Sequence, residues 1–412
     1  MSNNLTEFEQ VVCRGCGLDV HKQNVVCTIM GDGIEEETRT FLTYTDDLLV
    51  LSDWLKKAGI THLAMESTGV YWKPVYNLLE NDFEIILVNA RHIKNVPGHK
   101  TDKKDSAWIA KLLLSGLLKG SFIPVQFTRE LRDLYRYKRK LIQQRVNERN
   151  RSQKILQDGN IKISSVLTDI YGKTGRLIMD ALIEGVSDPD LLGNFAQGQV
   201  RKRIDILKKA LKGNMGLQHR YMLATSRKML FNIEEAVNQL DERIEKYLAY
   251  MPVQRTLLQT IPGVNRETII AILGELGTDM SVFPDHHHLA SWCGLCPGNN
   301  ERAGKKKSGK ITAGNKYLKS ALIEAAWLSC RKSAKDSFLK RKFKSVASRR
   351  GKKKGLIAVA HKILIAAYYI LRDKVPYQEP DNKVYAEKRK QAQINRYLTR
   401  LRELGIYIPS QS

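Results

Sequence analysis

Apolar residues in the first 120 positions fall into short runs, which alternate with stretches where apolar residues recur every three or four positions. Short runs bounded by polar or glycine turns predict strands, and three-and-four spacing predicts amphipathic helices. Strands are expected at residues 11–20, 24–30, 37–42, 61–65 and 83–88. Helices are expected at residues 48–57, 70–79 and 103–118. The pattern therefore predicts an α/β domain with three strands before its first helix.

The rest of the chain has mainly helical spacing. Residues 129–157 and an apolar stripe at 229–247 predict two long helices that form a coiled coil, with each other or with another protomer. The first of these contains ten Lys and Arg, so its free faces are expected to contact nucleic acid. We predict an α/β plus all-α protein, in which a coiled-coil linker leads to a mainly helical C-terminal domain. Its parts are expected at residues 1–125, 126–252, 253–375 and 376–412, the last a helical tail.

Four acidic residues occupy positions where these elements can meet. Asp19 and Glu66 each end an apolar run, so both are expected at strand ends. Asp102 and Asp105 are three residues apart on an expected helix, which puts both carboxylates on one face. Converging carboxylates repel each other unless a divalent cation neutralises them, and hard oxygen ligands favour Mg²⁺ or Mn²⁺. These four acids are therefore the candidate catalytic and metal-binding residues.

The predicted order of elements resembles the ribonuclease H/RuvC-like arrangement. In that arrangement the first strand, the fourth strand and the last helix bring their carboxylates together. Asp19, Glu66 and the Asp102–Asp105 pair lie on the corresponding elements. The resemblance implies a metal-dependent enzyme that acts on phosphodiesters.

The charge of the chain favours a polyanionic partner. Its 68 Lys and Arg against 43 Asp and Glu give a formal net charge of +25. Cations that neutralise phosphates release counterions, so nucleic acid is favoured over a membrane surface or a role in solubility alone. The sequence has no evident run of about 18 apolar residues and a polar N-terminus, so we expect a cytoplasmic protein with no membrane partner.

Cysteine and histidine clusters are alternative metal ligands. Two C-x-x-C pairs, beginning at Cys13 and Cys293, have the composition of a zinc site. They lie far apart in the sequence, so reduced and mostly buried thiols are favoured. Three consecutive histidines starting at His286 cannot all face one metal and are expected in a solvated turn.

Basic residues concentrate in the C-terminal part. Residues 293–318 are too glycine-rich for a packed element and are expected to form a flexible loop, while residues 331–354 hold twelve Lys and Arg against one acid. Ile261-Pro-Gly-Val resembles a helix-hairpin-helix turn that presents backbone N–H groups to a phosphate, with an ordinary helix start as the alternative. The candidate nucleic-acid-binding residues are Gly263, Lys305, Lys306, Lys307, Lys310, Lys316, Arg349, Arg350, Lys352, Lys353 and Lys354.

Several motifs resemble the IS-one-ten family of bacterial insertion-sequence transposases, over nearly the whole chain. Glu66-Ser-Thr-Gly and Lys100-Thr-Asp-Lys-Lys-Asp are close to the contexts of the Asp-Glu-Asp-Asp set in that family's RuvC-like domain. Ile261-Pro-Gly-Val, Leu289-Ala-Ser-Trp-Cys-Gly-Leu-Cys-Pro-Gly and Gly314-Asn-Lys-Tyr-Leu resemble its second transposase domain.

The resemblance implies a recombinase that cuts donor and target DNA and rejoins them to move its own insertion sequence in the bacterial nucleoid. It implies a noncoding bridge RNA as guide, Mg²⁺ held by the four acids, and a dimer or tetramer in which sites form between protomers. It also implies a serine in the second domain that attacks the phosphate and forms a phosphoserine link.

The chain departs from the family at that serine. After Pro-Gly-Asn-Asn it has Glu301-Arg302-Ala-Gly, so Arg302 occupies the nucleophile position. A guanidinium binds phosphate but cannot form a phosphoester. The copy is then impaired in strand transfer, unless Ser308, Thr312 or Ser291 replaces the missing serine.

Two other functions fit the same residues. A RuvC-like nuclease that uses water as nucleophile needs no serine, so Arg302 would not harm it. A non-cleaving protein that binds the DNA or RNA of the element would use only the basic residues. Loss of the acids would abolish activity if the protein is either of the two enzymes. It would leave binding intact if the protein only binds nucleic acid.

Overall fold

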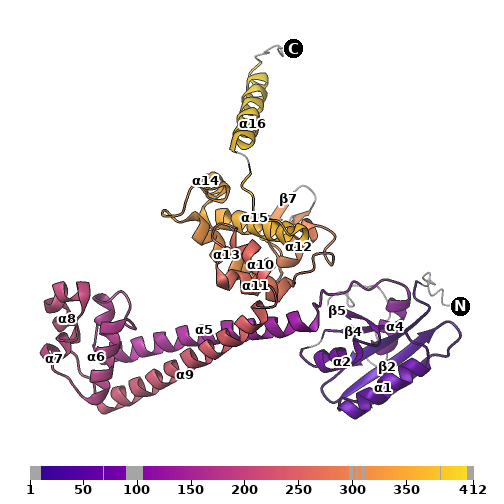
Figure 1. Cartoon of the computed structure of the whole chain (residues 1–412), viewed down its shortest axis with the longest axis horizontal. Coiled ribbons are helices and arrows are strands. Elements are labelled where there is room, and N and C mark those ends of the chain that lie inside the picture. Colours follow the sequence, from indigo (N-terminus) through magenta and orange to yellow (C-terminus); the bar gives the residue numbers. More distant parts are fainter. Residues whose placement is uncertain are drawn as a thin grey trace. The chain divides into compact units, whose positions relative to one another are not determined.

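The computed structural model describes residues 11–67, 69–89, 105–296, 300–302, 305–308, 311–380 and 382–405. The chain divides into two compact units, Met1–Ile123 and Pro124–Ser412 (Figure 1). The first is a mixed α/β unit and the second is mainly helical.

The first unit is built on a mixed five-stranded sheet. Its strands are β1 (Arg14–Val20), β2 (Asn24–Gly31), β3 (Glu37–Leu42), β4 (His62–Glu66) and β5 (Glu84–Val88). Their order across the sheet is β3-β2-β1-β4-β5. The first three strands are antiparallel neighbours, whereas β4 runs parallel to both β1 and β5. The predicted strands are confirmed, with ends that differ by at most three residues.

Helices cover both faces of this sheet. They are α1 (Thr45–Lys57), α2 (Trp72–Leu79) and α4 (Asp105–Leu114). The apolar faces of α1 and α2 bury Leu51 and Leu79 against alternate strand residues such as Leu18. On the other face, Leu112 of α4 packs against Ala64 of β4. Because successive residues of a strand point to opposite faces, the sheet separates two apolar cores.

Two long helices, α5 (Gln126–Asp158) and α9 (Leu217–Leu248), pack along each other in the second unit (Figure 1). Short helices connect them around an apolar core that includes Ile178 and Leu207. These are α6 (Lys173–Glu184), α7 (Pro189–Gly193), α8 (Ile204–Leu211) and 3₁₀ turns at Ile163–Ser165 and Gly198–Arg203.

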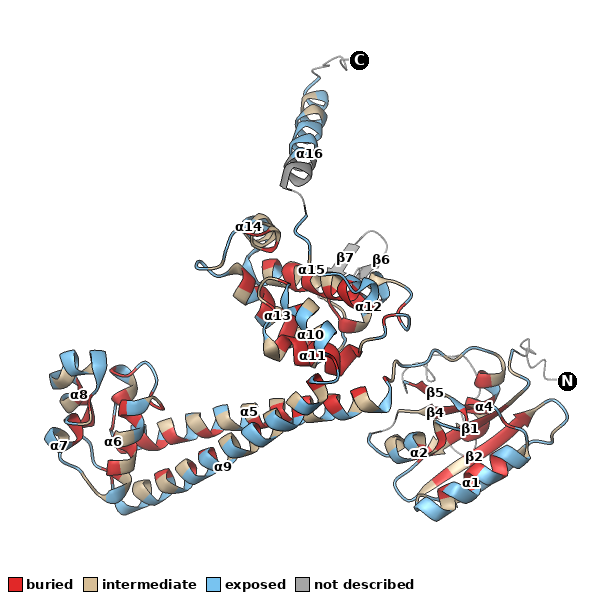
Figure 2. Cartoon of the chain, in the orientation of Figure 1, coloured by how far each residue is buried: buried red, intermediate tan, exposed pale blue. Residues whose placement is uncertain are grey.

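A compact helical group follows. Its elements are α10 (Pro252–Gln259), α11 (Arg266–Leu276), α12 (His286–Cys293), β6 (Asn300–Arg302), β7 (Lys305–Ser308), α13 (Lys316–Cys330), α14 (Phe338–Arg350), α15 (Lys352–Asp373) and α16 (Asn382–Glu403). Nearly all of α11 is buried, with α5 and α13 packed against it (Figure 2).

A buried carboxylate joins three of these helices. Glu275 of α11 is 0% exposed, and Arg136 of α5 donates two hydrogen bonds to its oxygens, at 2.8 and 2.7 Å. Asn315, the N-cap residue of α13, donates to the same carboxylate at 2.6 Å. Arg132 donates to the Glu275 carbonyl at 2.7 Å, and burial lowers the pKa of its guanidinium to about 10 although Glu275 opposes this.

This pairing corrects the expectation for the basic helix α5. Lys138 is buried and donates to Asp241 and Glu267, at 2.7 and 2.6 Å. Arg139 donates to Glu324 at 2.9 Å. Much of the charge of α5 is thus neutralised within the protein, because acids of other helices face it. The expectation of broad free cationic faces along α5 is wrong for these residues.

Two local predictions in the C-terminal part are also wrong. The stretch predicted as a flexible loop contains the hairpin β6–β7, in which Arg302 pairs with Lys305 and Asn300 with Ser308. The three histidines begin α12 instead of forming a turn, because the Asp285 carboxylate caps that helix by accepting from the backbone N–H groups of His287 and His288.

Helix α15 bears on the expectation that no segment of the chain spans a membrane. It is the one helix in the described parts of the chain that is long and apolar enough to cross a membrane by length and composition. Half of its apolar window is buried in the protein, with Val359, Ile363 and Ala367 packed inward. It also contacts α10, α12, α13 and α14. These contacts are those of a core helix.

Replacement of Glu275 by alanine is expected to lower the free energy of unfolding by about 3 kcal/mol, because it leaves the partly buried guanidinium groups of Arg132 and Arg136 without their counter-charge. Urea denaturation measures this change. The control is Glu324→Ala, which removes a partly exposed ion pair of the same unit and is expected to cost about 1 kcal/mol or less. Equal losses in the two variants would contradict the role given to Glu275.

Candidate active site

Asp19 lies near the end of β1, on the face that α4 covers. Gly15 and Gly17 precede it on the same face, and a Cβ at Gly17 would overlap the backbone of Ser106 and Ala110 in α4. Glycine at this position therefore lets α4 lie directly on β1. Ser106 in turn hydrogen-bonds Thr28 of β2, with 2.7 Å between the hydroxyl oxygens. The close approach places the first turn of α4 beside Asp19.

Glu66 and Asp105 come from two other elements. Glu66 is the last residue of β4, and Leu18 pairs with Met65 in the parallel register, so Asp19 and Glu66 follow at neighbouring strand ends. Asp105 is the first residue of α4. Negative charge in the first turn of a helix is favoured by the helix dipole. Three chain segments thus bring an acid to one edge of the sheet.

The electrostatics of Asp19 reflect this gathering. Burial raises the pKa of its carboxyl above the ordinary value, and the negative charges of Asp105 and Glu66 raise it further. His21 opposes the shift, with its Nε2 3.1 Å from Asp19 Oδ2. A carboxylate with this environment gains from a nearby cation, because a positive charge would offset both the desolvation and the repulsion.

The fourth acid, Asp102, lies outside the described residues. Within the described ranges, no three His, Cys, Asp or Glu side chains are grouped closely enough to hold a metal ion. The three described acids therefore interact electrostatically without forming a closed ligand set. They are oxygen donors throughout, which is the donor type that Mg²⁺ and Mn²⁺ prefer.

His21 is a site feature that the sequence reasoning missed. It follows Asp19 by two residues, and a strand period of two puts both side chains on one face. The sequence Asp19-Val20-His21 could therefore have indicated this contact. The contact between His21 Nε2 and Asp19 Oδ2, at 3.1 Å, restrains the orientation of the carboxylate.

The thiols do not form a second metal centre in the part of the chain that the structure describes. Cys16, Cys27 and Cys293 are buried, whereas Cys13 is exposed. Burial raises the pKa of Cys293 to about 12, which keeps its thiol protonated and inert.

The residues around the nucleophile position are placed by the backbone. Arg302 ends β6 opposite Lys305, and Ser308 ends β7 opposite Asn300. Lys305, Lys306 and Lys307 all lie in β7, whereas Lys310 lies outside the described residues. Ser291 is exposed on α12. The Thr312 hydroxyl is buried and has no hydrogen-bond partner among the described residues, a position that shields it from a substrate.

Five of the candidate cations gather at the junction of α14 and α15. They are all exposed and flank Gly351: Arg349, Arg350, Lys352, Lys353 and Lys354. None of them pairs with a carboxylate in the described ranges. Lysine at a helix N-terminus is disfavoured by the helix dipole, so three lysines at the start of α15 lower helix stability unless an anion binds there.

The other two described candidates, Lys316 and Gly263, lie outside this junction. Lys316 is exposed at the start of α13, with its Nζ 5.3 Å from the centre of the Tyr317 ring. Gly263 has φ +85° in the turn between α10 and α11, and a Cβ there would meet the backbone of Ala325 and Ser329 in α13. Close packing against α13 therefore requires glycine at this turn.

Comparison with known families identifies the class of protein. The DEDD model of the IS110 family, described as a transposase, matches residues 16–161, which include all four acids. A second model, described as the transposase IS116/IS110/IS902 family, matches residues 255–341. No curated protein sequence matches the chain significantly. The protein is thus a transposase, an enzyme that acts on DNA. It belongs to the IS110 family, the IS-one-ten family that its motifs resemble.

Replacement of Asp19 by asparagine is expected to stabilise the metal-free protein at neutral pH. The raised pKa of Asp19 means that the folded state holds this proton more tightly than the unfolded state, so folding stability falls as pH rises through the raised pKa. An asparagine side chain does not titrate, so the variant would lack this loss. Thermal unfolding with a chelator present, at acidic and at neutral pH, measures the difference.

The control is Asp53→Asn, which changes an exposed acid of α1 in the same unit. We expect the gain from Asp19→Asn to be larger at neutral pH than at acidic pH, and larger than that of the control. A loss of stability at neutral pH would argue against a crowded acidic cluster.

Proposed function

We propose that this transposase cuts and rejoins DNA strands at the edge of the sheet where Asp19, Glu66 and Asp105 meet, with Asp102 completing the acidic set. The observation that carries the proposal is the placement of three acids at the ends of β1 and β4 and at the start of α4, and the raised pKa of Asp19, due first to burial and then to the charges of Asp105 and Glu66, agrees with it. The strand order β3-β2-β1-β4-β5 supports a ribonuclease H/RuvC-like assignment for this unit.

The donor chemistry of this cluster fits Mg²⁺ or Mn²⁺. Carboxylates that repel one another at a half-buried strand end are stabilised by a divalent cation, and the four acids would hold it. When bound, such an ion would withdraw charge from phosphoryl oxygens. His21 restrains the Asp19 carboxylate, and the N-terminus of α4 favours the negative charge of Asp105.

The cationic junction of α14 and α15 supports DNA binding in the second unit. Its five exposed side chains lie at adjoining helix ends without acidic partners among the described residues. Phosphates of a DNA backbone would neutralise them and stabilise the start of α15. Contacts of this kind position a duplex without reading its sequence.

Recognition of a DNA sequence therefore needs another component. We propose a noncoding guide RNA that pairs with donor and target DNA. The net charge of +25 favours polyanionic partners, and a guide RNA would be one beside the DNA. We further propose a dimer or tetramer that acts in the bacterial nucleoid. The exposed apolar side chains of α9, Met229 and Phe231, support contact between protomers.

Arg302 stands where the family resemblance implies a serine, so the attack on the phosphate is the step at which this protein would differ from the family. A serine at this end of β6 would attack the phosphate through its hydroxyl oxygen and release the 3′ oxygen of the strand, conserving the bond for rejoining. Arginine cannot do so, and we propose that strand transfer is impaired here. The same residue favours a second candidate function, a RuvC-like nuclease in which water replaces the serine.

In an Arg302→Ser background, cleavage of DNA that carries an end of the insertion sequence is expected to fall at least about 100-fold when Asp19→Asn is added, because the metal site would lose an anionic ligand. Duplex binding should remain, since the basic residues are unchanged. Gel assays with Mg²⁺ measure cleavage, and electrophoretic mobility shifts measure binding. Cleavage at the Asp53→Asn level in Asp19→Asn would refute the acidic site.

Restoration of serine separates the two candidate enzymes. Arg302→Ser is expected to form a covalent protein–DNA adduct with Mg²⁺, DNA from the end of the insertion sequence and its flanking RNA, whereas the natural chain should form none. Denaturing gels with labelled DNA detect the adduct. The double variant Asp19→Asn/Arg302→Ser is the negative control.

An adduct on the natural chain would instead mean that another hydroxyl attacks. Ser308→Ala and Ser291→Ala would then identify it, because both residues lie near the same hairpin in the sequence. Cleavage by the natural chain without any adduct, in either form, would favour the water-dependent nuclease.

A further inference from the structure

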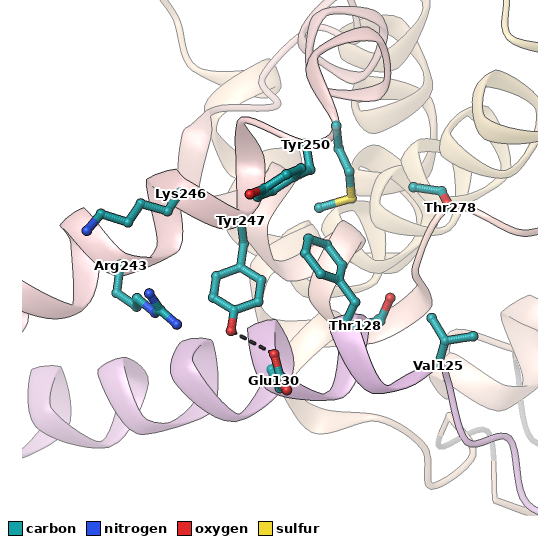
Figure 3. Close-up of a pocket in the computed structure, with 10 residues that line it drawn as sticks. Val125, Thr128, Glu130, Arg243, Lys246, Tyr247, Tyr250 and Thr278 are labelled. Carbon is teal, nitrogen blue, oxygen red and sulfur yellow. Dashed lines mark hydrogen bonds between the residues drawn. The ribbon is translucent and has the colours of Figure 1, made fainter. Parts of the chain in front are cut away.

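A cavity of about 710 Å³ lies where the first turn of α5 meets the end of α9 (Figure 3). Its volume is in the range of small-molecule sites. Aromatic and cationic side chains dominate its wall: Phe127, Tyr247, Tyr250, Arg243 and Lys246. Sequence periodicity had assigned Tyr247 to the apolar stripe of the helix, so the cavity is a feature of the folded chain.

The aromatic residues are ordered by contacts with one another. Phe127 has its ring centre 5.0 Å from that of Tyr247 and 5.8 Å from that of Tyr250, the second contact being edge-on. Tyr250 is nevertheless 79% exposed. A single edge-on neighbour covers at most one face of the Tyr250 ring, and with 79% of the residue exposed at least one face stays open for stacking.

The cations are close to this surface and lack acidic partners. Arg243 lies 5.4 Å from the centre of the Tyr247 ring, and Lys246 stands on the same wall. Neither forms an ion pair in the described residues. The one acid of the wall, Glu130, already accepts from the Tyr247 hydroxyl at 2.8 Å and from Gln126 at 3.1 Å.

The two cations thus outnumber the acid. An open aromatic ring beside two cations that have no carboxylate partner in the described residues matches a base and its phosphate.

We propose that this cavity binds one unpaired nucleotide of a DNA or RNA strand, with the base stacked on Tyr250 and the phosphate held by Arg243 and Lys246. The proposal rests on the proposed function, since it supplies a single-strand contact for a protein that opens DNA. A base within a duplex has both faces covered by its neighbours, whereas an unpaired base offers a free face to an aromatic ring.

A second cavity indicates how the strand continues. It has a volume of about 650 Å³ and shares Thr278 with the first. Arg372 and Lys374 lie on its wall with Asp279, and Arg372 is already paired with Asp373, its Nε 2.6 Å from the Asp373 carboxylate. A strand leaving the first cavity would therefore meet Lys374, a cation without an ion pair in the described residues, which can contact its backbone.

The test measures binding of the full chain to fluorescent oligonucleotides, without divalent cations so that cleavage cannot contribute. Probes are a single-stranded DNA, an RNA of the same sequence and the corresponding DNA duplex. Tyr250→Ala is expected to weaken single-strand binding about 10-fold, in line with the loss of one stacked base. Tyr250→Phe, which keeps the ring, should bind like the natural chain.

Tyr221→Ala is the matched control, because Tyr221 is 71% exposed on α9, the helix that precedes Tyr250, and lines neither cavity. Duplex binding should be unchanged in all three variants. A Tyr250-dependent loss on DNA, RNA or both supports the site and identifies the natural strand. Single-strand affinity equal to that of Tyr221→Ala on both probes would overturn it.

Replacing the cations checks the second half of the site. Arg243→Ala/Lys246→Ala should weaken single-strand binding and flatten its dependence on salt. Different experimental outcomes would disprove the nucleotide site and the proposed function. Unchanged single-strand binding in the Tyr250 variant, with Asp19-dependent cleavage intact, removes only the pocket. Absence of duplex binding by the natural chain, together with absence of cleavage by Arg302→Ser, removes the proposed function.

Discussion

Glu275 is fully buried, and its carboxylate is bound by Arg136 of α5 and by Asn315 at the start of α13. An unpaired charge in that position would be strongly destabilising, so the three helices are held in one arrangement by the need to keep it neutral. The adjoining group of Lys138 with Asp241 and Glu267 extends the same pairing to α9. Charge compensation, and not apolar burial alone, therefore fixes how the helices of the second unit meet.

The candidate functional surfaces are the places where this compensation is missing. In the first unit, three carboxylates gather at one edge of the sheet and raise the pKa of Asp19. In the second, the cations around Gly351 and those beside Tyr250 have no acidic partners in the described residues. The first set has the charge to hold a divalent cation, and the second has the charge to hold phosphates. A metal-dependent enzyme acting on DNA needs both.

The sequence was sufficient for the sheet because the strands carry strong local signals: short apolar runs with turns between them. Asp19 and Glu66 were placed at strand ends by the same reasoning. Long-range pairing was not accessible, since Arg136 and Glu275 lie 139 residues apart. The hairpin β6–β7 was missed because glycine and lysine are poor strand formers, so its pairing depends on tertiary context. The cavity at Tyr250 was missed for a similar reason, since α5 and α9 both contribute to it.

The acidic cluster is the centre of the account, and anomalous diffraction from crystals grown with Mn²⁺ tests it most directly. The predicted result is a manganese peak within bonding distance of Asp19, Glu66 and Asp105, with Asp102 as a further ligand, and no such peak in Asp19→Asn. A natural chain that binds no manganese there, with Glu66 or Asp105 turned away from Asp19, would contradict the account.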